Sequence, residues 1–263
     1  MHPPDVTTRT WPEIDALAPG AAVHVDPVGG TYPVLKLIIE YAAALVLLVP
    51  VLPVIGLCWI AIKLTSPGPG FYIQTRLGLG GRAYRIVKLR SMHHNCERHT
   101  GATWAAAKDD RIFRFGKFLR ATHLDELPQL FNVLAGHMSL IGPRPERPEV
   151  IRAKGLDRLV PGYHHRLLVR PGVTGLAQVQ LPPDLDVASV RHKVVYDLYY
   201  VQNQNIWLDT RIALATVFKA AGLRADRIRR MFFLPTRDVV AKVFQDGIAI
   251  PARAVAATTF QPA

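Results

Sequence analysis

Two adjacent carboxylates, Asp125 and Glu126, interrupt a largely apolar stretch of a chain that is otherwise strongly basic. One carboxylate can attack a phosphoryl group as a nucleophile, and a second can bind a metal ion. Pro128 suits the start of a helix and Gly136 its end, so the residues between them predict a short helix. The acids then lie just before a helix N-terminus, where free N–H groups favour anions. This arrangement indicates chemistry on a phosphorylated substrate.

An ordinary structural role for the acid pair is the alternative. Thr122 and Asp125 fit the S/T-x-x-D/E pattern of a helix cap, and acids near helix starts are common. The motif GPRPE favours the chemical interpretation, because Pro143 and Pro145 restrict the backbone and present the Arg144 guanidinium from a stiff support. A rigid arginine after an acid pair is typical of phosphate binding.

A basic β-hairpin is predicted ahead of the acid pair. Residues 71–76 and 83–89 alternate between apolar and polar types and flank a glycine-rich turn. Alternate side chains share one face of a strand, so Lys88 and Arg90 are expected to project together. The glycines predict a plain turn, with a phosphate-binding loop as the alternative.

The second half of the chain contains a further loop and two amphipathic helices. In RPGVTGLAQV, residues 170–179, the glycines form either an anion-binding nest or a loop between core elements. Residues 194–222 predict two helices that are separated near residues 203–205 and end at Gly222. Asp197 falls in an apolar and aromatic run, so it is either exposed or kept for a function.

One segment is apolar enough to enter a membrane. Residues 41–62 carry no charge, and as a helix they would extend about 33 Å, against about 30 Å for a hydrocarbon core. Pro50 and Pro53 at the centre favour a helix-break-helix that returns to the same leaflet over a kinked span. Basic residues follow at once, which predicts that the C-terminal part lies on the cytoplasmic side.

Composition adds the class of partner. Lys and Arg outnumber Asp and Glu by 32 to 20, so an anionic partner is expected. Residues 1–33 are acidic by contrast and predict a flexible tail. The two cysteines form no CxxC motif, which makes a cysteine-based metal site unexpected. The sequence has no basic-aromatic stacking surface and no helix-turn-helix pattern, so a nucleic-acid partner is not expected.

The motifs KLRSM, DRIFRFGKFLR, DELPQLFNVLAGHMSLIGPRPE, RPGVTGLAQV and YDLYYVQNQNIWLD, taken in order, resemble the bacterial sugar transferases known as monotopic phosphoglycosyl transferases. The resemblance covers about residues 34–220 and is to the small form of the family. It implies transfer of a sugar phosphate from a nucleotide diphosphate sugar to polyprenyl phosphate, usually undecaprenyl phosphate. This would be the first membrane step in making an exopolysaccharide, capsule, O-antigen or glycoconjugate.

The resemblance also implies roles for individual residues. Asp125 would be the nucleophile that carries a covalent phosphosugar, and Glu126 would hold or assist Mg²⁺. Lys88 and Arg144 would bind phosphate oxygens, and Asp197 matches another functional acid of the family. Secondary candidates for the site are Arg90, Arg120 and Gln129.

The implied fold is α+β and mostly helical, with a re-entrant membrane helix before a compact cytoplasmic catalytic domain that has a small β-hairpin and interfacial amphipathic helices. We expect a flexible tail over 1–33, the membrane helix over 34–65, the catalytic domain over 66–222 and a basic extension over 223–263. The inner membrane is the expected location, and a homodimer stays an alternative to a monomer.

Several features depart from the family pattern or compete with it. Lys36, Leu37 and Glu40 stand where the family commonly has Lys-Arg and an Asp, and Phe113 and His137 also differ. A competing D-x-D metal site of a nucleotide-sugar glycosyltransferase could use Asp184 and Asp186. In the C-terminal extension, basic and apolar residues predict either a membrane-facing patch or the solvated face of a core helix; they are Arg227, Arg229, Arg230 and 231–234.

Overall fold

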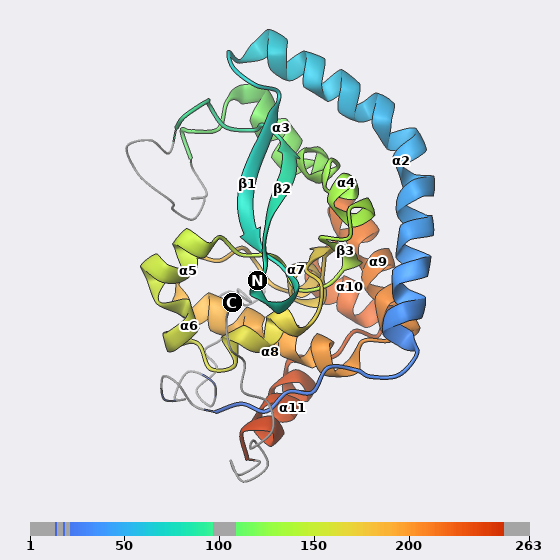
Figure 1. The fold of residues 1–263 in the computed structure, drawn as a ribbon, viewed down its shortest axis with the longest axis vertical. Helices are drawn as coiled ribbons and strands as arrows, with labels where there is room; N and C mark the ends of the chain where they lie inside the picture. The colour runs from blue at the N-terminus through green and yellow to red at the C-terminus, as the bar shows by residue number, and fades with distance from the viewer. Residues whose placement is uncertain (1–13, 15–17, 19–21, 97–108, 250–263) are drawn as a thin grey trace, which may run out of the picture.

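The computed structural model describes residues 14, 18, 22–96 and 109–249. Most of the predicted N-terminal tail and the end of the predicted C-terminal extension therefore lie outside the described residues. The described chain is mostly helical and carries two small sheets, in agreement with the predicted α+β class (Figure 1).

The elements follow one another along the chain, beginning with the long helix α2 (Tyr32–Thr65) and the hairpin strands β1 (Phe71–Leu77) and β2 (Ala83–Leu89). The rest of the fold is built from α3 (Arg114–Ala121), α4 (Gln129–Leu134), β3 (Ser139–Ile141), α5 (Pro148–Lys154), α6 (Leu156–Leu159), β4 (Gly172–Thr174), α7 (Leu176–Gln180), α8 (Val187–Asn203), α9 (Ile206–Ala220), α10 (Ala225–Met231) and α11 (Arg237–Ala249).

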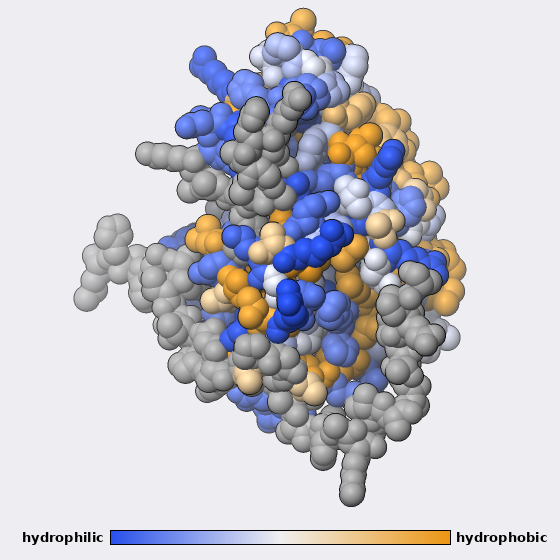
Figure 2. All heavy atoms as spheres, turned by 60° about the vertical axis from the view of Figure 1, so that its left-hand side comes forward, coloured by the Kyte–Doolittle hydropathy of each residue, from blue (hydrophilic) through white to orange (hydrophobic). Residues whose placement is uncertain are grey.

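Helix α2 is unbroken, which corrects the predicted helix-break-helix. Pro50 and Pro53 lie inside its 34 residues, and the chain bends along this helix without leaving the helical conformation (Figure 1). A proline removes one backbone donor and crowds the preceding turn, which a bend can accommodate. By length and composition α2 could cross a membrane, and only 17% of its most apolar window is buried. Figure 2 shows apolar side chains along this edge of the molecule.

The predicted hairpin is confirmed. Strands β1 and β2 pair antiparallel, with Phe71 opposite Leu89 and Leu77 opposite Ala83. Gly80 and Gly81 have φ values of 63° and 75°, a left-handed conformation that glycine adopts without a steric penalty. The glycines therefore build a tight turn, as the simpler interpretation predicted.

A second sheet joins β3 and β4 in parallel, with Ser139 opposite Gly172 and Ile141 opposite Thr174. Its glycines allow two backbones to touch. A Cβ on Gly172 would lie 2.1 Å from the Gly142 nitrogen, and one on Gly175 would lie 2.2 Å from the Gly142 oxygen. The glycines of RPGVTG thus hold the β3–β4 crossing together, which supports the loop between core elements over the anion-binding nest.

The main core is formed by the C-terminal helices. Helices α8 and α9 are separated at residues 204–205 and α9 is followed by Gly222, as predicted. Ile228, Val240 and Phe244 are buried in the same core, so these described residues after 222 pack with the main core. Val23 and Val25 are also buried there, which contradicts the predicted disorder for this part of residues 1–33.

Candidate active site

The acid pair lies in a single 3-10 turn, Leu124–Glu126, between α3 and α4. Helix α4 begins directly after Pro128, and Gly136 with φ of 77° follows its end, so the predicted short helix is confirmed. The capping alternative is contradicted, because α4 has no side-chain cap and the Thr122 hydroxyl donates to the Phe118 carbonyl at 2.8 Å. The carboxylates of the pair are thus not committed to a helix end.

Glu126 is held by two cations from different elements. Lys88 Nζ on β2 donates to Glu126 Oε1 at 2.7 Å, and Arg144 Nη2, in the loop after β3, donates to the same oxygen at 2.8 Å. Burial would raise the pKa of Glu126, but the charges of Arg144 and Lys88 outweigh it and hold the pKa well below its usual range. Glu126 is therefore ionised and fixed in position.

Asp125 has the opposite environment. Its side chain is buried, and within the described part of the chain it makes no hydrogen bond or ion pair. Burial and the adjacent Glu126 charge raise the pKa of Asp125, while Lys88, Arg120 and Arg144 oppose that rise. One acid is anchored and its neighbour is unengaged, so the two are suited to different roles.

The predicted partnership of Lys88 and Arg90 is wrong. Strand β2 ends at Leu89, and Arg90 turns away to donate to the Ser66 and Pro67 carbonyl oxygens at 2.7 and 2.8 Å. The guanidinium therefore stabilises the turn that follows α2. It does not face the acid pair.

Gln129, another predicted site residue, is the first residue of α4 and is only 1% exposed. Its side-chain Nε2 has no hydrogen-bond acceptor among the described residues. A buried amide donor without an acceptor is costly, so this group is available to a ligand at the start of α4.

Asp197 lies apart from Asp125 and Glu126 and is connected to the site through Arg166. Its carboxylate Oδ2 is 2.7 Å from Arg166 Nη2, and both side chains are buried. Burial raises the pKa of Asp197 to about 6, with Arg166 and Lys193 opposing the rise. Arg166 Nη2 in turn donates to the Arg144 carbonyl oxygen at 2.8 Å. Asp197 therefore holds Arg166, and Arg166 in turn binds the backbone of Arg144.

Arg166 was not among the predicted site residues. The signal for it was indirect: an acid in an apolar, aromatic run, such as Asp197, needs a cation when it is buried. Which of the chain's many basic residues would supply that cation depended on the packing of α8 against residues 163–168.

The competing D-x-D interpretation loses support. Asp186 caps α8 by accepting from the Ser189 N–H at 2.7 Å, with a reciprocal bond that completes a capping box. Asp184 forms an ion pair with Lys193 at 2.9 Å. Both carboxylates have structural partners, so a paired metal site here would have to break them.

The acid pair fits a magnesium ion better. Among the described residues, no group of three or more His, Cys, Asp or Glu side chains is arranged so that it could hold a metal ion. Mg²⁺ commonly needs only one or two carboxylates, because substrate phosphates and water complete its shell. Asp125 has a free carboxylate, and Glu126 Oε2 has only a long contact of 3.5 Å with Arg144. These two residues could hold the ion.

Comparison with known proteins identifies the family of the chain. The family described as Bacterial sugar transferase matches residues 31–222. A UDP-N-acetylgalactosamine-undecaprenyl-phosphate N-acetylgalactosaminephosphotransferase of Aeromonas hydrophila is 47% identical over 158 residues, 60% of this chain and 37% of the relative. A UDP-glucose:undecaprenyl-phosphate glucose-1-phosphate transferase of Caulobacter vibrioides is 41% identical over 223 residues, 82% of this chain and 78% of the relative.

A third relative, the exopolysaccharide production protein PSS of Rhizobium leguminosarum bv. phaseoli, is 44% identical over 179 residues, 66% of this chain and 88% of the relative. The chain spans less than half the length of several curated relatives that it matches, the Aeromonas protein among them. The matched residues 31–222 include α2, the hairpin, the acid pair and Arg144. The chain therefore belongs to the bacterial sugar transferase family.

Proposed function

We propose that this protein transfers a sugar 1-phosphate from a UDP-sugar to undecaprenyl phosphate. The observation that carries the proposal is the asymmetry of the acid pair, in which Lys88 and Arg144 hold Glu126 while Asp125 is unengaged. The names of the relatives describe this kind of reaction for those proteins. The reaction would be the first membrane step in making an exopolysaccharide or another surface glycan.

In the first step, an Asp125 oxygen attacks the phosphorus atom that bears the sugar. A new O–P bond forms, the bond to the bridging oxygen breaks, and the electron pair leaves with UMP. The nucleophile must be ionised, and Asp125 has no hydrogen bond or ion pair among the described residues that would have to break before the attack. Lys88 and Arg144 lie one residue away on Glu126 and can stabilise the charge that spreads over the phosphate oxygens.

In the second step, a phosphate oxygen of undecaprenyl phosphate attacks the same phosphorus atom, and the Asp125 carboxylate leaves. Two bulky anions thus use one small site in turn, and neither has to approach the other directly. Mg²⁺, held by Glu126, would neutralise phosphate charge when bound.

The lipid acceptor calls for a membrane location, and we propose that both ends of α2 lie at the cytoplasmic face. Ala44 in its first half packs with Leu130 and Val133, while Ile55, Cys58 and Ile62 in its second half pack with Phe113 and Leu119. Both halves of the helix thus rest on the same domain. A full span would draw that domain into the bilayer, so the contacts support a re-entrant path.

Helix α10 and the residues after it offer a second membrane contact. Met231 is 50% exposed and Phe233 is 80% exposed, and the exposed Arg227 and Arg230 lie beside them. Apolar side chains next to arginines favour an anionic lipid surface. Ile228 on the same helix is fully buried, so this basic patch lies on a core helix.

The products of the reaction test the proposed function. Purified protein with Mg²⁺, undecaprenyl phosphate and either UDP-glucose or UDP-N-acetylgalactosamine is expected to release UMP and form a lipid-linked sugar diphosphate. A glycosyltransferase of the D-x-D type would release UDP instead. Release of UDP, with Asp184→Asn and Asp186→Asn abolishing it, would replace the proposal with that alternative.

The pH dependence of the reaction should report the Asp125 carboxylate. The attack requires ionised Asp125, so the rate falls as the pH drops through its pKa, which burial and Glu126 raise above the ordinary aspartate value. Arg120 opposes that rise, and Arg120→Gln is therefore expected to move the acid limb of the kcat/KM profile to higher pH. Arg114→Gln, an exposed change on the same helix, serves as the control. An acid limb that stays in place in Arg120→Gln contradicts the assignment.

A further inference from the structure

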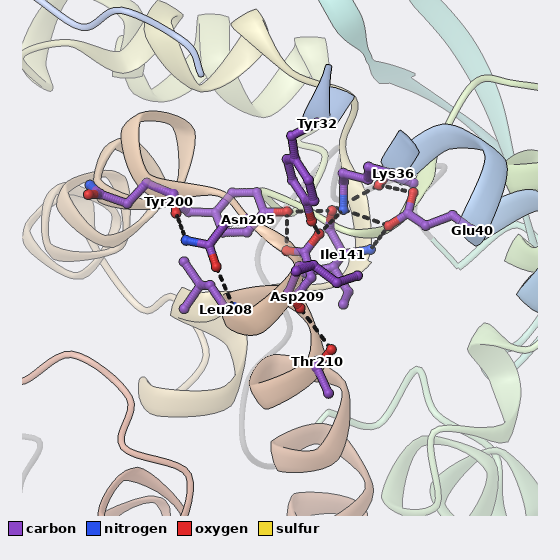
Figure 3. A network of polar contacts seen from close by, with 12 residues as sticks. Tyr32, Lys36, Glu40, Ile141, Tyr200, Asn205, Leu208, Asp209 and Thr210 are labelled. Carbon is purple, nitrogen blue, oxygen red and sulfur yellow. Dashed lines mark hydrogen bonds and ion pairs between the residues drawn. The ribbon is translucent and has the colours of Figure 1, made fainter. Parts of the chain in front are cut away.

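Helix α2 is joined to the catalytic domain by a buried polar network (Figure 3). Tyr32, Lys36 and Glu40 are spaced four residues apart and share one face of the helix. Tyr32 and Lys36 donate to Asp209 Oδ2 of α9, both at 2.5 Å, and Lys36 also donates to Glu40 Oε1 at 2.6 Å. The network therefore contains two buried carboxylates, of which Asp209 docks the helix.

Glu40 makes a different connection from Asp209. Its Oε2 accepts from the Ser139 hydroxyl at 2.5 Å, and its Oε1 accepts from the Ile141 N–H at 3.1 Å. Both partners belong to the three-residue strand β3, whose other edge is paired with β4. A side chain of the membrane helix thus takes the place of a neighbouring strand along β3.

Strand β3 leads directly to the arginine of the site. Gly142 and Pro143 separate Ile141 from Arg144, and Pro143 and Pro145 stiffen the backbone on either side. The Gly142 nitrogen donates to the Thr174 carbonyl oxygen at 2.9 Å, and the Gly142 backbone lies close to those of Gly172 and Gly175. Two residues therefore separate the strand that Glu40 contacts from Arg144, whose guanidinium donates to Glu126.

We propose that Glu40 is a positioning residue that sets Arg144 against Glu126 through β3. The inference rests on the proposed function, since Arg144 has its importance in that reaction. Glu40 is 7% exposed, and its removal would leave the Ser139 hydroxyl and the Ile141 N–H without their acceptor. Arg144 is then correctly placed against Glu126 only while α2 is docked on the domain.

The kinetic test compares residues on the same face of α2. Glu40→Ala is expected to lower kcat by about 10- to 100-fold, the cost of a small misplacement near the reacting atoms, with a smaller change in the KM for the UDP-sugar. Glu40→Gln, which keeps one acceptor oxygen, should give an intermediate loss. Tyr32→Phe removes a bond to Asp209 only and should leave kcat close to that of the unaltered protein. Wild-type kcat in Glu40→Ala overturns the proposal.

A double-mutant cycle separates positioning from general destabilisation. If Glu40 acts through Arg144, then Glu40→Ala should cost much less in an Arg144→Lys background than in the unaltered protein. Equal losses in the two backgrounds overturn the proposal. Should Arg144→Lys alone leave turnover unchanged, the role of Arg144 in the proposed function fails instead, and the two failures are thereby distinguished.

A measurement independent of activity completes the test. Amide hydrogen exchange of peptides from residues 139–147 is expected to accelerate in Glu40→Ala and Glu40→Gln, because the Ile141 N–H loses or weakens its acceptor. Peptides from α8 should exchange at an unchanged rate if the fold is retained. Unchanged exchange in residues 139–147 overturns the proposal, and faster exchange throughout the protein assigns Glu40 a purely structural role.

Discussion

Asp125→Asn is expected to lower turnover by at least about 1,000-fold and to abolish the covalent phosphosugar adduct, because the amide lacks the charge and nucleophilicity of the carboxylate. The substitution preserves the size of the side chain and breaks no hydrogen bond, since Asp125 makes none in the described part of the chain. The protein should therefore stay folded and keep its affinity for the UDP-sugar. Turnover and UMP release measure the first effect.

The adduct is detected by intact-protein mass after incubation with a UDP-sugar in the absence of the lipid acceptor. Asp157→Asn is the matched control, because Asp157 is an exposed acid on α6. It should retain both turnover and the adduct. Normal turnover by Asp125→Asn would rule out Asp125 as the nucleophile, and an adduct that persists in this variant would assign the covalent bond to another residue.

Removal of Mg²⁺ is expected to have an effect of similar size. Excess EDTA should stop UMP release, and added Mg²⁺ should restore it, since the charge of the transferring phosphate would otherwise be left to Lys88 and Arg144 alone. Glu126→Gln should raise the Mg²⁺ concentration for half-maximal rate by at least about tenfold, because a neutral amide is a poorer ligand. The rate measured against free Mg²⁺ gives both results.

Glu149→Gln is the control for the metal assignment, because Glu149 is an exposed acid on α5 whose side chain is 53% exposed. Its Mg²⁺ dependence should match that of the unaltered protein. Undiminished activity in excess EDTA removes the metal from the reaction. A Glu126→Gln variant with lower kcat but the same Mg²⁺ dependence would leave Glu126 the role of aligning Lys88 and Arg144.

Local signals in the sequence were reliable where the structure depends on neighbours in the chain. Pro128 and Gly136 bounded α4, and the glycines of the hairpin predicted its turn, because fixed or left-handed φ values act within a few residues. The same kind of signal gave a wrong prediction at Pro50 and Pro53, where a break in the helix was expected. A proline predicts a break, but α2 stays helical through both prolines and only bends, with buried residues on either side of them packed against the domain.

Side-chain direction was less predictable than the elements themselves. Strand alternation placed Arg90 beside Lys88, yet the strand ends one residue earlier and Arg90 binds the turn at Ser66. Val23 and Val25 were expected in a disordered tail because the composition around them is acidic and rich in proline and glycine. They are buried because α8 and its neighbours provide an apolar surface that composition does not describe.

The sequence by itself determined the class of chemistry: an acid pair ahead of a helix, a stiff arginine, a basic hairpin and an apolar segment, all readable from residue types within short windows. Only the tertiary structure decided how the two acids differ, since Glu126 acquires Lys88 and Arg144 across 38 and 18 residues while Asp125 acquires no partner among the residues that the structure describes. It also joined Asp197 to Arg166, and Glu40 to a strand 99 residues away. The physical reason is burial, because a charge removed from water must find a partner, and only the packing of distant elements determines which one is within reach.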